Sequence, residues 1–318
     1  MKFLVTGANG FVGQHLCAEL LRQGQSVRAA VRSADSSIGN TEAAVVGAID
    51  GETNWADALH DVDVVIHLAA RVHVMKDTAT DPLTEFLKIN TQGTANLARQ
   101  AAAAGVKRLV YVSSIKVNGE QTTETQPFAE SDTPNPQDAY AISKWRAEQI
   151  LQRIAQETGL EVVIVRPPLV YGSGVKGNFI RLLAAADKGI PLPLASVRNK
   201  RSLIYLGNLV DALLICASHP AAAGKTYLVR DGEDASILDL VRQTATGLER
   251  PVRLFPLPVW LLRGLGRLLG KPESVERIVG SLRVNDDLIR KELGWKPVFT
   301  LQQGLQATAL WYKARRHP

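Results

Sequence analysis

The chain has 318 residues and a mass of 34.5 kDa, which suits one large domain with a smaller lobe. Hydrophobic residues make up 46% and charged residues 21%, values that exclude a disordered or fibrous chain. Only two cysteines are present, which excludes a disulfide framework and a cysteine-rich zinc module. The first residues do not read as a secretory signal, and no apolar run is long enough to span a membrane. We therefore expect a cytoplasmic protein.

The net charge of +6 is unevenly distributed. From Arg250 to the end there are 13 Lys and Arg against 5 Asp and Glu. Such a basic segment suits an anionic ligand or an anionic membrane surface, although a solvated basic face is the more common cause. Aromatic residues are sparse at 6%, and no nucleic-acid-binding motif is present, so we expect no nucleic-acid partner.

The first half of the sequence alternates short apolar segments with stretches of helical periodicity. The apolar segments are rich in Val, Ile and Leu, which is typical of parallel strands covered on both faces. This alternation predicts an α/β fold with a Rossmann-type, doubly wound parallel sheet. The expected strands are 2–6, 26–31, 44–48, 62–68, 108–113 and 161–166, and the expected helices are 11–23, 54–59, 82–104, 138–158 and 176–188.

The pattern loosens after about residue 170, where Gly and Pro become frequent. We expect a sheet domain over 1–170, to which some later segments return, and a smaller, mostly helical lobe over 171–318 that caps a cleft. The helices expected there are 207–217, 236–247, 258–269, 273–281, 286–293 and 301–315.

A glycine-rich loop, TGANGFVG over residues 6–13, follows the first strand and opens the first helix. Gly7 permits a tight turn, Gly10 lets the backbone approach a pyrophosphate, and Gly13 allows the helix to pack closely on the strand. The helix N-terminus directs its free N–H groups at the anion. The loop therefore predicts a dinucleotide site.

The end of the second strand bears on which dinucleotide binds. An acidic residue there usually accepts from a free ribose 2′-OH, but this chain has Arg32, with Arg28 and Ser33 nearby. A guanidinium matches a 2′-phosphate, so we expect NADP(H), with NAD(H) as the alternative. Asp50 follows the third strand and either reaches the adenine or caps the next turn.

A Ser, Tyr and Lys set predicts redox chemistry on a carbonyl or alcohol. Ser114 follows the fifth strand, and Tyr140 and Lys144 lie one turn apart on a predicted helix. An ammonium near a phenol lowers the phenol's pKa, so Tyr140 can exchange a proton at neutral pH. A hydroxyl at the carboxyl end of a strand can hold the reacting oxygen.

With these motifs in view, the sequence resembles an extended short-chain dehydrogenase/reductase of the nucleotide-sugar epimerase/dehydratase type. The resemblance covers nearly the whole chain. Besides Tyr140 and Lys144, it rests on residues 6–13, LAA at 68–70, NTQGT at 90–94, SSIKVNG at 113–119, RPPLVYG at 166–172, RSLIYLGNLVDA at 201–212 and ELGWKP at 292–297.

The resemblance implies roles for individual residues. Ser114, Tyr140 and Lys144 are the implied catalytic residues, and Tyr140 and Lys144 also contact the cofactor. The other implied cofactor contacts are Gly7, Gly10, Phe11, Val12, Gly13, Arg32, Asp50, Leu68, Ala69, Ala70 and Pro167. The substrate contacts are Ser114, Tyr140, Asn178, Arg201 and Arg277, with the two arginines holding a diphosphate, and no metal site is expected.

The chain departs from many epimerases at Leu169, Asn118 and Asn208, where Asn, Tyr and Asp are usual. The sequences of the segments around Ser114 and Tyr140 look closest to those of bacterial reductases of UDP-4-keto-6-deoxy-N-acetylhexosamines. We therefore expect NADPH-dependent reduction of such a C4 ketone, giving UDP-N-acetylquinovosamine or UDP-N-acetylfucosamine for surface polysaccharides such as lipopolysaccharide O-antigen.

Three other functions would place different demands on these residues. The alternative is a UDP-N-acetylhexosamine or UDP-glucose 4-epimerase. A dehydratase is disfavoured because Ile115 and Lys116 supply no carboxylate beside Ser114. A non-catalytic NADP-sensing protein is disfavoured because it has no need of the intact Ser, Tyr and Lys.

Two further features do not point to a function. His67 and His73 lack the partners of a metal site, so we expect packing or loop histidines. The segment 258–271 has an apolar face of five leucines opposite basic residues. It could contact a membrane surface, but we favour packing on the lobe's own core or on a partner subunit. The family resemblance implies a homodimer.

Overall fold

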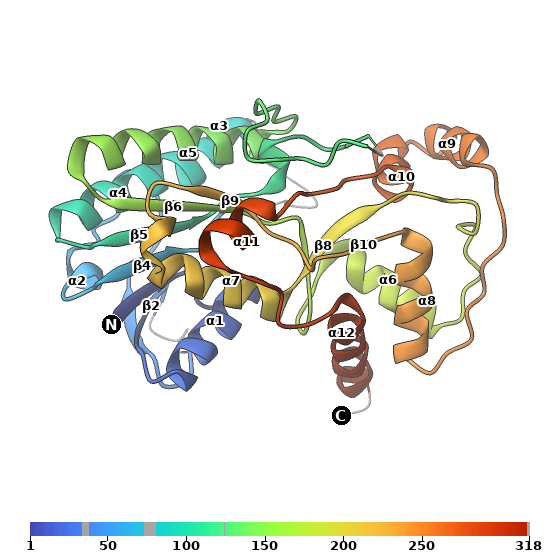
Figure 1. Ribbon diagram of the computed structural model, residues 1–318, viewed down its shortest axis with the longest axis horizontal. Helices are drawn as coiled ribbons and strands as arrows, with labels where there is room; N and C mark the ends of the chain where they lie inside the picture. Colours follow the sequence, from blue (N-terminus) through green and yellow to red (C-terminus); the bar gives the residue numbers. More distant parts are fainter. Residues whose placement is uncertain (34–37, 73–80, 124, 317–318) are drawn as a thin grey trace.

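The computed structural model describes residues 1–33, 38–72, 81–123 and 125–316, and its core is a seven-stranded, wholly parallel sheet (Figure 1). The strand order β3-β2-β1-β4-β5-β6-β9 runs outward in both directions from the neighbouring strands β1 and β4, as in a doubly wound fold. The predicted fold class is thereby confirmed. The strands are β1 (Lys2–Thr6), β2 (Ser26–Val31), β3 (Glu42–Val45), β4 (Val64–His67), β5 (Arg108–Val112), β6 (Glu161–Arg166) and β9 (Thr226–Leu228).

Alternate residues of these strands are buried on opposite faces, which explains why they read as continuous apolar runs. In β1, Phe3 and Val5 join one core cluster while Leu4 joins the other. The first cluster lies under α1 (Phe11–Arg22) and α7 (Leu206–Ser218), and the second under α4 (Thr94–Ala103) and α5 (Ala139–Thr158). Figure 1 shows these helix pairs on the two sides of the sheet.

The helix predicted over 82–104 is one continuous helical stretch in three parts. It begins as α3 (Pro82–Phe86), passes through a π-helical segment, η1 (Leu87–Gly93), and continues as α4. Asp81 caps its start by accepting from the Thr84 N–H at 3.3 Å, and a proline occupies the first turn. The π segment carries Asn90, whose side chain bonds to the Arg71 backbone on one side and to Ser143 of α5 on the other.

The second part of the chain contains a small sheet that the sequence did not predict. It has the order β10-β8-β7, formed by β10 (Asp234–Ala235), β8 (Arg201–Tyr205) and β7 (Leu169–Tyr171). These strands have two to five residues, too few to show a period. The sheet shares a core with α6 (Gly177–Asp187), α8 (Ile237–Gly247) and α12 (Leu301–Arg316).

The strand expected over 44–48 is β3, which begins two residues earlier. Two elements from the later part of the chain join the parallel sheet: α7 packs on it, and β9 extends it beside β6. The division of the chain near residue 170 stays a prediction. The remaining helices are α2 (Ala56–Leu59), the short 3-10 turns η2 (Ile115–Val117) and η3 (Pro220–Ala222), α9 (Val259–Leu268), α10 (Pro272–Val279) and α11 (Asp287–Leu293).

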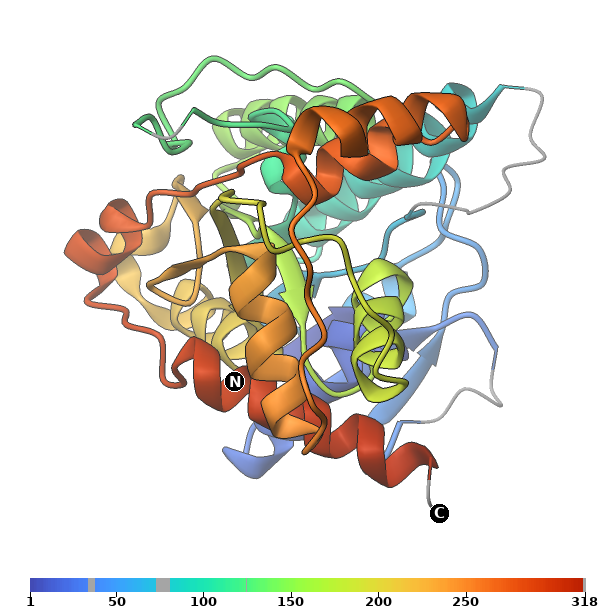
Figure 2. The ribbon, with the colours of Figure 1, turned by 90° about the vertical axis from the view of Figure 1, so that its right-hand side faces the viewer.

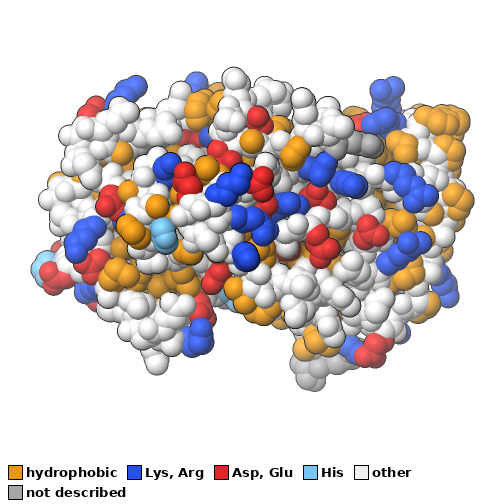
Figure 3. Space-filling view, in the orientation of Figure 1, with side chains coloured by type: hydrophobic (Ala, Val, Ile, Leu, Met, Phe, Trp, Pro, Cys, Tyr) orange, Lys and Arg blue, Asp and Glu red, His pale blue; other side chains and the backbone are white. Residues whose placement is uncertain are grey.

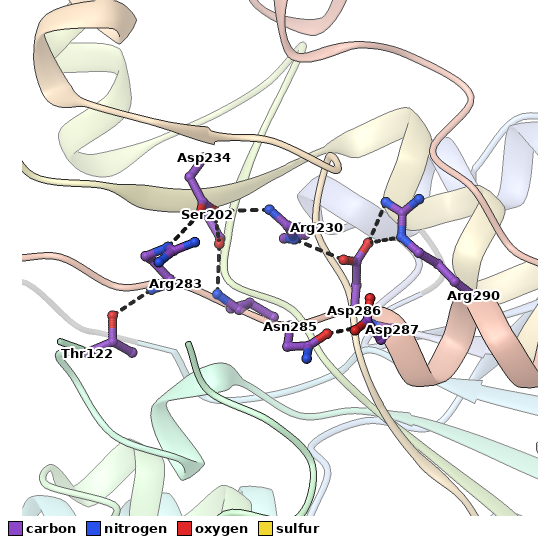
Figure 4. A network of polar contacts seen from close by, with 10 residues as sticks. Thr122, Ser202, Arg230, Asp234, Arg283, Asn285, Asp286, Asp287 and Arg290 are labelled. Atoms are coloured by element: carbon purple, nitrogen blue, oxygen red, sulfur yellow. Dashed lines mark hydrogen bonds and ion pairs between the residues drawn. The ribbon is translucent and has the colours of Figure 1, made fainter. Parts of the chain in front are cut away.

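The segment 281–286 joins the two sheets through side chains and backbone (Figure 4). On one side, the Ser202 N–H of β8 donates to the Leu282 carbonyl at 2.8 Å. On the other, the Phe128 N–H donates to the Arg283 carbonyl at 2.8 Å. Asp286 then accepts from Arg230 at 2.9 Å and from Arg290 at 2.7 Å. This segment fixes the loop after β5 against the small sheet.

Candidate functional site

The glycine loop has the geometry that its sequence predicts. Gly7 has a φ of +66°, and a Cβ on it would lie 2.8 Å from the Ala69 nitrogen. A Cβ on Gly13 would lie 2.2 Å from the Gly7 carbonyl oxygen, so only glycine permits this packing. Gly10 is exposed and caps α1, whose first residues are Phe11 and Val12. The loop therefore presents the N-terminus of α1 beside the end of β4, an arrangement that fits a dinucleotide pyrophosphate.

A buried histidine fixes the ends of β1 and β4 behind this loop. His67 Nδ1 lies 2.6 Å from the Thr6 hydroxyl, and its Nε2 lies 2.9 Å from the Thr94 hydroxyl. The same Thr6 hydroxyl accepts from the Ala69 N–H at 3.2 Å, which positions the LAA segment. Burial, together with the charge of Lys144, lowers the pKa of His67 to about 3. His67 is a packing histidine, as expected, and His73 lies outside the described residues.

The residues expected to read the ribose and adenine lie at the ends of β2 and β3. Arg32 is exposed, one residue beyond β2. Arg28 is not available beside it, because it is buried and bound to Glu42 and to carbonyls near α2. Asp50 accepts from the Glu52 N–H at 2.9 Å and from the Thr53 hydroxyl at 3.3 Å, so its carboxylate caps a turn. Those bonds, with Lys88 nearby, lower the pKa of Asp50.

The two serines after β5 have different environments. The Ser113 hydroxyl donates to Glu148, which is fully buried and also receives the Arg166 guanidinium at 2.5 Å. Ser114 instead caps the short turn η2 and lies close enough to Tyr140 to lower the pKa of its phenol. Only Ser114 is thus placed beside the phenol.

Tyr140 and Lys144 lie together in α5, but the electrostatics differ from the sequence-based expectation. Burial, and next the Asp138 charge, raise the pKa of Tyr140, although the Ser114 hydrogen bond opposes them. Lys144 donates to the Val112 carbonyl at 2.8 Å, and its Nζ lies 6.0 Å from the Tyr140 ring centroid. Burial lowers the pKa of Lys144 to about 7. The expected lowering of the Tyr140 pKa is therefore wrong for this structure, because desolvation and the Asp138 charge raise it.

The two arginines expected to bind a diphosphate are neighbours. Arg201 begins β8, and its guanidinium donates to the carbonyls of Arg277 at 3.0 Å and Gly280 at 3.1 Å. Burial and the Arg277 charge lower the pKa of Arg201, which shows that the two cations act on one another. Asn178 is exposed in the first turn of α6. Pro167 is buried, and its carbonyl accepts from the Ile115 N–H at 3.0 Å.

Sequence reasoning missed several polar contacts around this site. Lys116 binds Asp138, the residue that caps α5, and Asn118 accepts from Arg166 at 2.9 Å. Their partners are far along the chain, so no local pattern signals them. A cleft of about 350 Å³ lies beside the turn after β5, lined by Asn118, Gly119, Glu120, Gln121, Phe128, Asn135 and Gln137.

Comparison with known proteins places these features in context. The family described as "NAD dependent epimerase/dehydratase family" matches residues 3–229. A UDP-glucose 4-epimerase from Vibrio cholerae is 44% identical over 97% of this chain and 94% of its own length. A 3-beta-hydroxysteroid dehydrogenase from Mycolicibacterium neoaurum is 28% identical over 98% of this chain and 91% of its own length.

A solved structure supports the same grouping. MoeE5 in complex with UDP-glucuronic acid and NAD has a TM-score of 0.79 and 26% identity, covering 99% of this chain and 100% of its own. The fold here is therefore an NAD(P)-binding Rossmann fold. Within the described residues, no helix is both long and apolar enough to cross a bilayer.

Proposed function

Because the chain belongs to the NAD-dependent epimerase/dehydratase family, we propose that it is a 4-epimerase of a UDP-linked hexose or N-acetylhexosamine. The observation behind this proposal is the placement of Ser114, at the turn after β5, close to Tyr140 of α5, with Lys144 one turn further along the same helix. The match to a UDP-glucose 4-epimerase over nearly the whole chain favours this function over the reductase that the sequences around Ser114 and Tyr140 suggested.

Each residue has a part in this proposal. Tyr140 takes the proton from the C4 hydroxyl and later returns it, while Ser114 holds the same oxygen. A nicotinamide dinucleotide bound at the glycine loop would supply the oxidant for C4 and the means of reducing it again. Arg201 and Arg277 hold the diphosphate, so that the hexose can turn its other face to the site.

Lys144 serves both the proton transfer and the cofactor in this proposal. Its Nζ lies between the Val112 carbonyl and the Tyr111 ring, 4.5 Å from that ring's centroid. A pKa of about 7 lets it carry a proton or release it at neutral pH. It can therefore balance the charge of Tyr140 as the phenol gives up and regains its proton.

A second candidate is the NADPH-dependent reductase of a UDP-4-keto-6-deoxy-N-acetylhexosamine. It is favoured by one observation, the exposed Arg32 beyond β2 with no acidic residue at that strand end. A reductase exchanges its cofactor at each turnover, whereas an epimerase gains by retaining NAD⁺. The cofactor content of the purified protein therefore separates the two functions.

The test combines cofactor analysis with NMR analysis of the products. The epimerase should copurify with about one NAD⁺ per chain and interconvert UDP-glucose and UDP-galactose, or the N-acetyl pair, without added cofactor. Protein that carries no NAD⁺ and consumes NADPH with the 4-keto sugar would instead establish the reductase. In that case Arg32→Asp should weaken NADPH about 10- to 150-fold through loss of a charge-assisted bond.

A further inference from the structure

Helices α9 and α10 form a hairpin at the end of the lobe (Figure 2), and this hairpin leaves large apolar side chains exposed. Among its own residues α9 buries only Gly266, and α10 buries none. The inner side of α9 is formed by Val259 and Leu262, which pack on the cluster around Val241. Gly266 backs on α10, since a Cβ there would lie 2.5 Å from Val275.

The opposite side of α9 faces solvent with large apolar side chains. Trp260 is 71% exposed, Leu268 is 82% exposed, and Leu269 just beyond the helix is 69% exposed. At 100° per residue, Trp260, Gly264 and Leu268 fall on the side away from Val259 and Leu262. The expectation that this stripe packs on the lobe's own core therefore holds for Leu262 but is wrong for Leu268 and Leu269, which are exposed.

Basic residues accompany this exposed face. The stretch from Arg250 to Pro272 has five Lys and Arg and no Asp or Glu. Arg263 and Arg267 are exposed on one flank of α9, and Lys271 follows its end. Arg263 is paired with Glu276 of α10 at 2.8 Å. Figure 3 shows hydrophobic and basic side chains side by side at this end of the molecule.

We propose that the outer face of α9 docks on an anionic lipid bilayer and lies in its interface. An amphipathic helix with Trp and Leu on one side and Arg or Lys beside them has the composition of an interfacial helix. Indole rings favour the water–lipid boundary, and each nearby cation adds attraction to anionic headgroups.

The charge argues against a second copy of the chain as the occupant. Two α9 faces that met across a twofold axis would bring Arg267 and Lys271 of both copies together, while the nearby acids of α10, Glu276 and Glu273, are already paired with Arg263 and Arg277. An anionic headgroup layer neutralises them instead. This surface does not include Ser114, Tyr140 or Lys144, so the proposal stands or fails independently of the proposed activity.

The experiment is sedimentation of the full chain with vesicles. Wild-type protein should bind phosphatidylethanolamine–phosphatidylglycerol vesicles, bind phosphatidylcholine vesicles at least tenfold more weakly, and lose affinity as salt is raised. Leu268→Asp should weaken binding at least tenfold, the scale of one exposed leucine buried in lipid. The matched control is Leu310→Asp on α12, where Leu310 is 52% exposed, and it should bind like wild type.

Two further measurements keep the result decisive. Circular dichroism melting checks that Leu268→Asp is folded, and a lipid-induced blue shift of fluorescence that is lost in Trp260→Phe locates the contact. No binding by wild-type protein, or equal binding by Leu268→Asp, would overturn the proposal. So would sedimentation velocity that shows a wild-type dimer and a Leu268→Asp monomer, because a second copy would then cover the face.

Discussion

Lys116 Nζ lies 2.5 Å from the Asp138 carboxylate, across a gap of 22 residues in the chain. Asp138 also caps α5 by accepting from the Ala141 N–H at 2.7 Å. It stands two residues before Tyr140, and its charge contributes to the raised pKa of that phenol. Lys116 therefore places a positive charge against the carboxylate that opposes ionisation of Tyr140.

Replacing Lys116 should move the pH dependence of catalysis. In Lys116→Met the Asp138 charge is no longer balanced, so the Tyr140 pKa should rise further. Sugar oxidation needs the phenolate, so the pH at which its rate rises should shift upward by roughly 0.5 unit or more. The measurement is single-turnover formation of reduced nicotinamide against pH. Lys116→Arg keeps the charge and should keep the wild-type pH profile. A Lys116→Met profile identical to that of wild type would exclude this role of Lys116.

Removing the Tyr140 hydroxyl should abolish most of the proton transfer. Tyr140→Phe should lower kcat by about 100-fold or more, the scale of a lost general acid or base, with cofactor binding unchanged. The matched control is Tyr227→Phe, since Tyr227 is buried in β9 and bonds Glu292 at 2.8 Å, away from Ser114. Activity of Tyr140→Phe within about threefold of wild type would remove Tyr140 from the proton transfer.

The diphosphate assignment is tested through Arg201. Arg201→Ala should weaken UDP binding by about 1.5–3 kcal/mol, the scale of a charge-assisted hydrogen bond. Cofactor affinity should not change. Because Arg201 also donates to the carbonyls that end α10, the melting temperature must be measured beside the Kd from calorimetry. Arg153→Ala, at an exposed position of α5, is the control. Equal loss of UDP and cofactor binding would assign Arg201 to the fold alone.

The parallel sheet could be predicted because its strands are buried on both faces, so residues such as Leu4 and Val5 leave an unbroken apolar signal. The small sheet could not, because β10 has two residues and β7 three. Within the site, the sequence marks Ser114, Tyr140 and Lys144 through their order and spacing. The sequence does not show that Ser113 donates to Glu148, because these residues are 35 positions apart and their contact depends on how α5 lies on the sheet.

Acid should destabilise the fold through His67. The folded-state pKa is about 3, below the ordinary value of 6.5, so the unfolded chain binds more protons between these values. Stability due to His67 is therefore intact above about pH 6.5 and is lost as the pH falls towards 3, up to about 5 kcal/mol. Urea unfolding at pH 7, 6, 5 and 4 measures the slope. His67→Gln should flatten that slope, whereas His15→Gln at an exposed position should not.

The buried ion pair between Glu148 and Arg166 should be the most sensitive electrostatic element behind the site. The Glu148 side chain is fully buried and that of Arg166 is 5% exposed, and the carboxylate also accepts from Ser113. Glu148→Gln leaves the guanidinium without a counter-charge in the interior, so the free energy of unfolding should fall by about 3–5 kcal/mol. Urea unfolding measures it.

A surface pair provides the contrast for this last prediction. Lys313 and Glu249 lie 2.8 Å apart, but their side chains are 45% and 76% exposed, so Glu249→Gln should leave stability essentially unchanged. The double variant Glu148→Gln with Arg166→Met should recover part of the loss, because it removes the unpaired cation together with the carboxylate. If Glu148→Gln lowers the free energy of unfolding no more than Glu249→Gln does, the Arg166 guanidinium is solvated. The buried network then does not hold Ser113 and the turn η2 in place.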